Sequence, residues 1–222
     1  TVSCRSSSRG RSPSRSRAAW KAAGTLARWA MGRTLYCAGA GPGEAPRAGN
    51  GRDRDWLAPA DGAPAAADVF GFNGGSAALS RTAIADVGPL EESLFMYYED
   101  TELSWRLRRR GWGVQHVPAA RTVHDHAASS GTSSDFFLDH NEQNRLLVAL
   151  VHAPVTVVLR ALVRAVARCL LGPARRRRAR VLLGVLRRTG WALRRRREVD
   201  RAATVPRAVP AALLVPDAAV AR

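Results

Sequence analysis

The uneven distribution of apolar residues is the feature that most limits how this chain can fold. Residues 1–31 are a low-complexity basic stretch containing the run SRGRSPSRSR, which buries too little apolar surface to fold alone, so we expect disorder there. Residues 32–67 are rich in Gly, Pro and Ala and are predicted to form a loop region. Residues 201–222 form an Ala-, Val- and Pro-rich segment that we expect to be a flexible tail. A folded core is therefore expected between residues 68 and 200.

Positive charge dominates the composition. The chain carries 35 Lys and Arg residues against 18 Asp and Glu, a formal net charge of +17. A charge of this size attracts nucleic acid, anionic lipid or nucleotide diphosphates, without selecting among them. Cys4, Cys37 and Cys169 are far apart and odd in number, which predicts neither a disulfide framework nor a metal site and favours a cytoplasmic setting. The Ser/Arg-rich start has no apolar run, so no secretory signal is predicted.

The segment from 68 to 152 has the pattern of a mixed α/β domain. Strand-like runs flank the pair Gly74-Gly75, which indicates a bend where the backbone approaches another group closely. The other expected elements are, in order, a helix over 82–87, a helix over 101–110, a strand over 114–117 and a helix over 136–151. Asp100 stands where the N-cap of the second helix belongs.

A basic region over 153–200 is predicted to hold two amphipathic helices, at 155–171 and 179–197. Arg160, Arg164 and Arg168 interrupt the first apolar run every four residues, which excludes a comfortable membrane span. Basic amphipathic helices of this kind lie on anionic membranes. Solvated helix faces would produce the same pattern, and the sequence leaves both interpretations open.

The run Tyr97-Tyr98-Glu99-Asp100 is the most informative stretch for chemistry. It places two adjacent carboxylates behind an aromatic wall at the start of a helix. The helix N-terminus favours the ionised carboxylate, whereas burial and the neighbouring charge raise its pKa. A carboxylate under both influences suits a general base that takes a proton from an alcohol. An acidic residue that only caps the helix would produce the same local pattern.

Three segments, FNGGSAALSR, VGPLEESLFMYYEDTELSWRLRRRGW and VPAARTVHDH, occur in this order between residues 72 and 126. Together they resemble the second half of family 2 glycosyltransferases, especially the bacterial rhamnosyltransferase-like group, and the resemblance covers about residues 32–150. The Glu-Asp pair followed by Leu-x-x-Arg is the most specific part of the resemblance. It implies an α/β fold, a partial GT-A-type glycosyltransferase fold comprising the acceptor half, over residues 68–152.

The resemblance also implies roles for individual residues. Asp100 would be the catalytic base of an inverting transfer, with Glu99 orienting it or touching the acceptor. The implied substrate-binding residues are Gly74, Gly75, Tyr98, Trp105 and Arg106. His124 would contact a divalent cation (Mg or Mn) or the diphosphate. Bracing of the helix by Arg106 and packing of Trp105 are the structural alternatives.

The implied partners are a nucleotide-sugar donor and a glycan or lipid-linked acceptor. Such chemistry would place the protein at the inner face of the plasma membrane, as a peripheral protein on an anionic surface. No specific nucleic acid is expected, because the acidic YYED segment would repel phosphates. A basic nucleic-acid-binding protein, or a membrane-surface adaptor without catalysis, is the alternative that the charge suggests.

One departure from the family concerns the donor side. No early strand with an Asn-rich loop is recognisable, and the nucleotide-binding half is missing from the sequence. Asp53-Arg54-Asp55 has the Asp-x-Asp spacing of a metal-binding motif, but it lies in Gly/Pro-rich sequence where no preceding strand is predicted, so we interpret it as a chance match. A truncated enzyme is therefore expected, and the sequence leaves open whether this chain is active.

Overall fold

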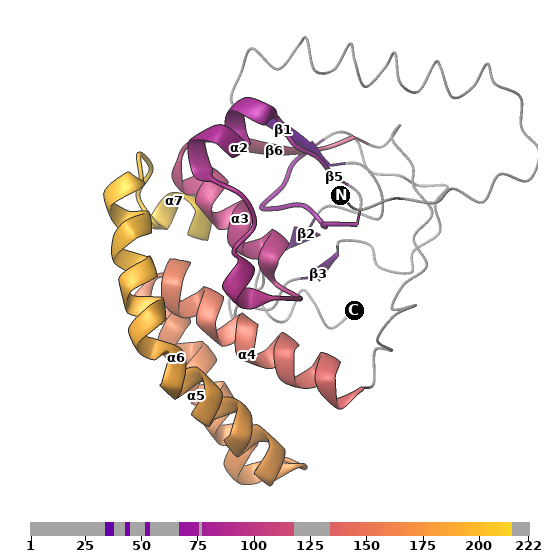
Figure 1. Ribbon diagram of the computed structural model, residues 1–222, viewed down its shortest axis with the longest axis vertical. Coiled ribbons are helices and arrows are strands. Elements are labelled where there is room, and N and C mark those ends of the chain that lie inside the picture. Colours follow the sequence, from indigo (N-terminus) through magenta and orange to yellow (C-terminus); the bar gives the residue numbers. More distant parts are fainter. Residues whose placement is uncertain are drawn as a thin grey trace, which may run out of the picture. The chain divides into compact units, whose positions relative to one another are not determined.

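The structure is a computed structural model that describes residues 34–37, 43–44, 52–53, 67–75, 77–117 and 134–214 (Figure 1). The chain divides into two compact units, Thr1–Arg33 and Thr34–Arg222, and every described residue belongs to the second unit. The disorder predicted for residues 1–31 therefore falls outside the described residues.

A small mixed sheet joins segments that are far apart in the sequence. Its order is β4 (Ala67–Asp68), β6 (Gly113–His116), β1 (Thr34–Cys37) and β5 (Ala77–Ala78). Strand β6 runs parallel to β1 and antiparallel to β4, while β1 and β5 are antiparallel. A separate antiparallel pair consists of β2 (Gly43–Glu44) and β3 (Arg52–Asp53).

The prediction that residues 32–67 form only a loop was wrong, because this range contains β1, β2, β3 and the first residue of β4. Strand β1 forms by pairing with β6, about eighty residues away, and a local Gly/Pro count does not register such long-range hydrogen bonding. The predicted strand over 114–117 is confirmed as β6, which begins and ends one residue earlier, and the side chains of Val114 and His116 on this strand are buried.

Two helices pack against this sheet and form the smaller of two cores. Helix α2 (Arg81–Val87) ends at Gly88, whose φ of 85° is accessible to glycine at little cost, as the Gly-Pro stop signal predicted. Helix α3 (Glu99–Arg109) follows a 3₁₀ turn, η2 (Glu92–Leu94). The core between them and the sheet consists of Val69, Phe72, Ala83, Leu103, Leu107, Trp112 and Val114.

The C-terminal half of the described chain is helical. Helix α4 (Asp135–His152) begins at Ser134, whose hydroxyl caps the backbone N–H of Phe137. Helix α5 (Val155–Leu171) has the predicted bounds, set by Pro154 and by Gly172-Pro173. Helix α6 (Arg175–Ala202) is longer at both ends than the predicted 179–197. Ion pairs from Arg177 to Asp135 and Asp139 of α4 hold its first turn in place. The start at residue 175 was not predicted, because these contacts join two helices that are distant in the sequence.

One large core connects α3 to all the helices that follow it. Its buried members include Tyr98 and Trp105, Leu146 and Leu147 of α4, Val157 of α5, Val185 of α6, and Leu214. The predicted domain over 68–152 and the predicted basic region over 153–200 therefore share a core. Figure 1 shows α4, α5 and α6 packed together along their lengths.

The predicted flexible tail needs correction over 201–214. The backbone N–H groups of Thr204 and Val205 both donate to the carbonyl of Arg109 at 3.0 Å, which fixes this segment on the end of α3. A short helix, α7 (Ala208–Ala211), follows. Residues 215–222 lie outside the described residues.

The described residues are mainly helical, and they do not by themselves support the predicted GT-A-type fold, which stays a prediction. Among the described residues, no helix is both long and apolar enough to cross a membrane.

Candidate functional site

Asp100 lies half-buried in the first turn of α3, and three donors fix its carboxylate. The backbone N–H of Gly74 donates to Oδ2 at 3.0 Å, and the N–H and hydroxyl of Thr101 donate to Oδ1 at 2.6 and 3.2 Å. Gly75 is held in the same turn, because its N–H donates to the Asn73 side chain at 2.8 Å. The structure thus brings the predicted Gly74 into contact with the predicted base, across a gap of 26 residues in sequence, while Gly75 follows it in the turn.

Ser104 of α3 fixes the backbone of residues 71–75, the segment that contains Gly71, Gly74 and Gly75. Its hydroxyl donates to the Asp100 carbonyl at 2.7 Å and accepts from the Phe72 N–H at 3.3 Å. A Cβ on Gly71 would lie 2.6 Å from the Ser104 hydroxyl, so the backbone there passes too close to α3 for any side chain. A Cβ on Gly74 would be 3.7 Å from Asp100, an ordinary contact. The residue that must be glycine for steric reasons is therefore Gly71, which sequence reasoning missed.

The prediction of Asp100 as the N-cap was wrong. The cap position is Tyr98, in the left-handed conformation with φ 69°, and Asp100 is the second residue of the helix. Phe95 and Tyr97 also have positive φ values, of 61° and 68°. Bulky residues rarely adopt this conformation, and it persists only where surrounding contacts enforce it.

Asn144 of α4 supplies those contacts. Its side-chain Nδ2, fully buried, lies 2.8 Å from the carbonyls of Leu94 and Met96 and 2.9 Å from that of Tyr97. The Tyr97 ring packs edge-on against Phe137 of the same helix, with 4.9 Å between ring centroids. Helix α4 thereby sets where α3 begins and where Asp100 stands. The sequence offered no signal that singles out Asn144, because Asn141, Arg145 and His152 are polar residues of the same helix.

Burial is the main cause of the shifted pKa values of the acidic pair, Glu99 and Asp100. It raises the pKa of Asp100, against hydrogen bonds from Gly74 and Thr101 that lower it. It also raises the pKa of Glu99, and the nearby charge of Asp100 raises that pKa further. Glu99 Oε2 is buried and finds no hydrogen-bond partner among the described residues. The two carboxyl groups therefore exchange protons nearer to neutral pH than ordinary carboxyls do.

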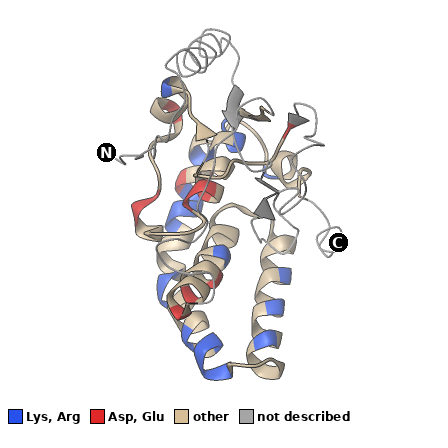
Figure 2. Cartoon of the chain, turned by 90° about the vertical axis from the view of Figure 1, so that its right-hand side faces the viewer, with Lys and Arg blue, Asp and Glu red and all other residues tan. Residues whose placement is uncertain are grey.

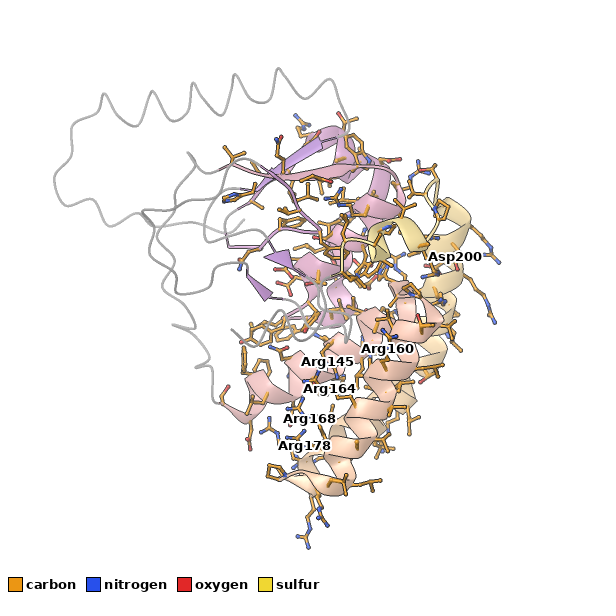
Figure 3. All side chains as sticks on the ribbon, turned by 180° about the vertical axis from the view of Figure 1, so that it is seen from behind. Arg145, Arg160, Arg164, Arg168, Arg178 and Asp200 are labelled. Atoms are coloured by element: carbon orange, nitrogen blue, oxygen red, sulfur yellow. The ribbon has the colours of Figure 1, made fainter. Side chains whose placement is uncertain are left out.

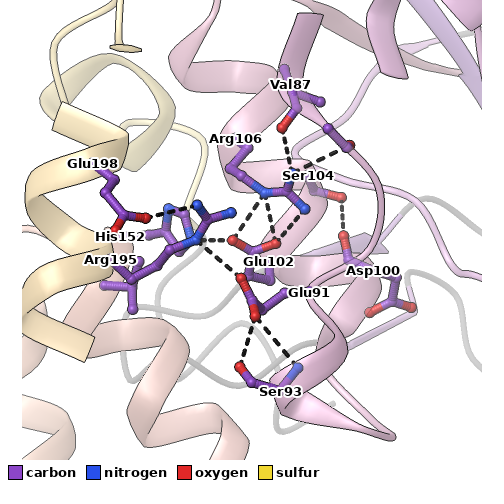
Figure 4. A network of polar contacts seen from close by, with 12 residues as sticks. Val87, Glu91, Ser93, Asp100, Glu102, Ser104, Arg106, His152, Arg195 and Glu198 are labelled. Atoms are coloured by element: carbon purple, nitrogen blue, oxygen red, sulfur yellow. Dashed lines mark hydrogen bonds and ion pairs between the residues drawn. The ribbon is translucent and has the colours of Figure 1, made fainter. Parts of the chain in front are cut away.

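Arg106 lies in a buried polar network beside the acidic pair (Figure 4). Its guanidinium pairs with Glu102 at 2.7 Å and donates to the carbonyls of Val87 and Pro89 at 2.5 and 2.6 Å. His152 of α4 contacts the other side of Glu102, with Nε2 3.0 Å from Oε1. The network joins α3 to α4 and to the end of α2, so the contacts of Arg106 are those of a brace for the helix.

Opposing influences set the pKa values inside this network. Burial favours the neutral Glu102 carboxyl, but hydrogen bonds and charges from His152 and Arg106 outweigh it and lower the pKa of Glu102 to about 2. Burial lowers the pKa of His152, against the attraction of Glu102. Glu102 is therefore an ionised structural partner and not a second base.

Tyr98 and Trp105, the two aromatic residues predicted to bind substrate, are buried in the large core. Trp105 is buried, edge-on to Phe70 at 4.9 Å and stacked with His152 at 6.0 Å between ring centroids. Tyr98 is buried in the same core. Neither ring offers an open face on which a sugar could stack.

The predicted metal contact, His124, lies outside the described residues. Asp53 ends the two-residue strand β3, so the premise that no strand precedes the Asp-x-Asp spacing was wrong, while Arg54 and Asp55 lie outside the described residues. Within the described ranges, no three His, Cys, Asp or Glu side chains come together as metal ligands.

A cavity of about 220 Å³ lies between α2, α3 and α6, and its lining includes Arg106, Arg109, Arg110 and Arg195. Asp100 is not among its lining residues. This hollow therefore borders the Arg106 network and is not the space into which Asp100 would accept a proton.

Comparison with known proteins gives a partial match. Over 91 residues, 40% of this chain, the sequence is 31% identical to N-acetylglucosaminyl-diphospho-decaprenol L-rhamnosyltransferase of Mycobacterium tuberculosis, in both the CDC 1551 / Oshkosh and the ATCC 25618 / H37Rv strains. The match spans 30% of the length of these curated relatives. No protein-family model matches the chain. The similarity relates the chain to glycosyltransferases, and so to transferases, at that general level.

Proposed function

We propose that this chain is the acceptor-side part of an inverting family 2 glycosyltransferase with a partial GT-A-type fold, and that Asp100 is its catalytic base. One observation carries the proposal: the Asp100 carboxylate is fixed at the start of α3 by Gly74 and Thr101, and burial raises its pKa. A base must be both positioned and able to take a proton near neutral pH. The similarity to a rhamnosyltransferase supports the reaction class.

The proposed step is a single displacement. Asp100 accepts the proton of an acceptor hydroxyl while that oxygen forms a bond to the anomeric carbon of the donor sugar. The bond from that carbon to the diphosphate oxygen breaks, and the nucleoside diphosphate leaves with the electron pair. Attack opposite to the leaving group inverts the anomeric centre. Glu99, whose pKa is also raised, would orient Asp100 or touch the acceptor.

The substrates follow from the relatives' name. It specifies an L-rhamnose transferred to a decaprenol-linked N-acetylglucosaminyl diphosphate. We infer a nucleotide-activated sugar as donor and a lipid-linked glycan of this class as acceptor, with the protein peripheral to the inner face of the plasma membrane. A divalent cation, when bound, would neutralise charge on the leaving diphosphate. The described residues do not provide its ligands, and His124 is the residue we propose for contact with it.

A chimera tests the assignment of Asp100. Residues 68–152 of this chain, which contain both Asp100 and Glu92, replace the corresponding part of the M. tuberculosis rhamnosyltransferase, and transfer of rhamnose to the lipid-linked acceptor is measured. We expect activity in the chimera, and a loss of about a thousandfold with Asp100→Asn, which keeps the shape but cannot take the proton. Glu92→Gln is the matched control, since Glu92 is an exposed carboxylate on η2 and should leave transfer unchanged.

Two outcomes would reject the proposal. Asp100→Asn activity within about tenfold of the unsubstituted chimera would exclude a general-base role. A chimera that melts like the parent enzyme but transfers no sugar would indicate that the chain is an adaptor without catalysis.

A further inference from the structure

Three aromatic rings meet at the surface, between the segment that precedes α3 and the first turns of α4. The centroid of the Phe95 ring lies 6.4 Å from that of Phe136 and 6.3 Å from that of His140. Phe136 and His140 are four residues apart on one face of α4, with 4.0 Å between their ring centroids. Phe95 is 73% exposed and Phe136 is 40% exposed. These three residues form what we call the aromatic cluster.

The backbone at Phe95 is strained. Its φ and ψ are 61° and −60°, and the N–H of Met96 donates to the carbonyl of Leu94 at 2.8 Å. This geometry is the rare γ-turn with positive φ, which is unfavourable for a residue with a large side chain. The buried Asn144 side chain holds the carbonyls on both sides of Phe95, those of Leu94 and Met96. The fold therefore maintains a strained turn that keeps an apolar ring in solvent. Neither the strain nor the exposure stabilises the folded chain, which indicates a role in binding.

The aromatic cluster lies close to the proposed base. Phe95 and Asp100 are five positions apart, so their Cα atoms are separated by at most about 18 Å, and the turns between them shorten this distance. One short segment thus carries an aromatic surface at one end and the acidic pair at the other. A substrate that reacts at Asp100 can reach the cluster with a part that lies some way from its reacting hydroxyl.

We propose that the aromatic cluster binds the isoprenoid chain of the acceptor. This inference rests on the proposed function, in which the acceptor is a lipid-linked glycan: a sugar carries the reacting hydroxyl, and a diphosphate and a hydrocarbon chain follow it. The rings of Phe95 and Phe136 offer apolar surface without hydrogen-bonding groups, which fits a hydrocarbon chain and would leave the hydroxyls of a sugar without partners. His140 is the polar member of the cluster, and its Nδ1 lies 3.1 Å from the Phe136 carbonyl of its own helix.

The probes for this site must be uncharged, because arginines elsewhere on the chain attract any phosphate-containing lipid. Figure 2 shows basic residues, in blue, along the packed helices, and Figure 3 shows Arg160, Arg164 and Arg168 following one another along α5. Farnesol, a short isoprenoid alcohol, represents the hydrocarbon part of the acceptor. N-acetylglucosamine represents its sugar part. The two probes therefore separate the contribution of the chain from that of the sugar.

NMR titration of the full chain with farnesol tests the proposal. We expect saturable binding, with nuclear Overhauser contacts from farnesol to the rings of Phe95 and Phe136. Phe95→Gly should weaken binding by at least about tenfold, because a phenyl contact is lost. The melting temperature of this variant should stay the same or rise, since glycine adopts a positive φ at little cost. Phe136→Ser should also weaken binding about tenfold. Leu186→Ser is the control, at a 69% exposed position on α6, and should change binding by less than about twofold.

Farnesol binding that lacks contacts to the two phenyl rings, or that persists undiminished in Phe95→Gly, would overturn the proposal. Binding of N-acetylglucosamine that is lost in Phe95→Gly would assign the aromatic cluster to a sugar. Dissociation of a solution dimer by Phe95→Gly would show that a second copy of the chain covers the cluster.

The titration does not depend on sugar transfer, so this inference and the proposed function can fail separately. Full activity of the Asp100→Asn chimera would reject the base and leave the farnesol result standing. An active chimera, together with a full chain that does not bind farnesol, would reject the isoprenoid site alone.

Discussion

At the scale of single residues, what distinguishes Asp100 is its set of neighbours. An Asp near a helix start is usually a cap, but here Tyr98 occupies the cap position and Asp100 binds the distant Gly74 N–H. The carboxylate is thus fixed by a segment that is not its own helix. Glu99 beside it lacks a partner for Oε2 among the described residues, so its charge is poorly compensated. The pair therefore differs electrostatically from two acids in an ordinary first turn.

Asp100→Asn should lower the pKa of Glu99. The Asp100 charge is the second cause that raises this pKa, after burial, so removing the charge leaves burial as the cause that raises it, against a backbone hydrogen bond that lowers it. Because both folded-state pKa values are raised, the folded protein binds protons more tightly than the unfolded chain, and stability falls as the pH rises through the raised values. Side-chain carboxyl NMR titrations measure both pKa values. An unchanged Glu99 pKa in this variant, with Glu92→Gln as control, would contradict the coupling.

At the scale of elements, α4 determines where α3 begins. Asn144 holds three carbonyls of the segment before α3, and this segment contains the bulky residues with positive φ. His152, two turns further along α4, holds Glu102 and through it Arg106. The acidic pair is therefore positioned by a helix that contributes no side chain to it.

Asn144→Ala should destabilise the protein by roughly 2–3 kcal/mol, because buried carbonyls lose their donor and the positive-φ residues lose their support. Asn141→Ala is the matched control on the same helix, at a partly exposed position, and should cost less than about 1 kcal/mol. Chemical denaturation measures both. Equal effects of the two substitutions would show that Asn144 does not hold the segment.

At the scale of the whole described structure, the chain after α4 is an integral part of the fold. Arg207 donates to the carbonyls of Val151 and His152 at 2.9 and 2.6 Å and pairs with Asp200 at 2.6 Å. Asp200 in turn pairs with Arg109 of α3. With Leu214 in the large core, these contacts attach residues 203–214 to α3, α4 and α6.

Truncation after Ala202 should therefore cost at least about 3 kcal/mol, from the lost hydrogen bonds and the lost burial of Leu214. Truncation after Leu214 is the control, since it removes only residues 215–222. Urea unfolding of the two truncated chains gives the comparison. An unchanged midpoint in the shorter chain would restore the interpretation of 201–214 as a flexible tail.

Elements whose cause is local could be predicted from the amino-acid sequence. The 3.6-residue period and the flanking Pro and Gly residues defined α5, and Gly88-Pro89 ended α2. The acidic pair stood out because its residue types and spacing are local as well. The other features depend on contacts between distant parts of the chain. Strand β1 needs β6 as a partner, and Asn144 fixes a strained segment some fifty residues earlier. Arg106 braces its helix because Glu102 and the Val87–Pro89 turn face its guanidinium group. These depend on long-range hydrogen bonds and burial, whose energies no local window of sequence contains.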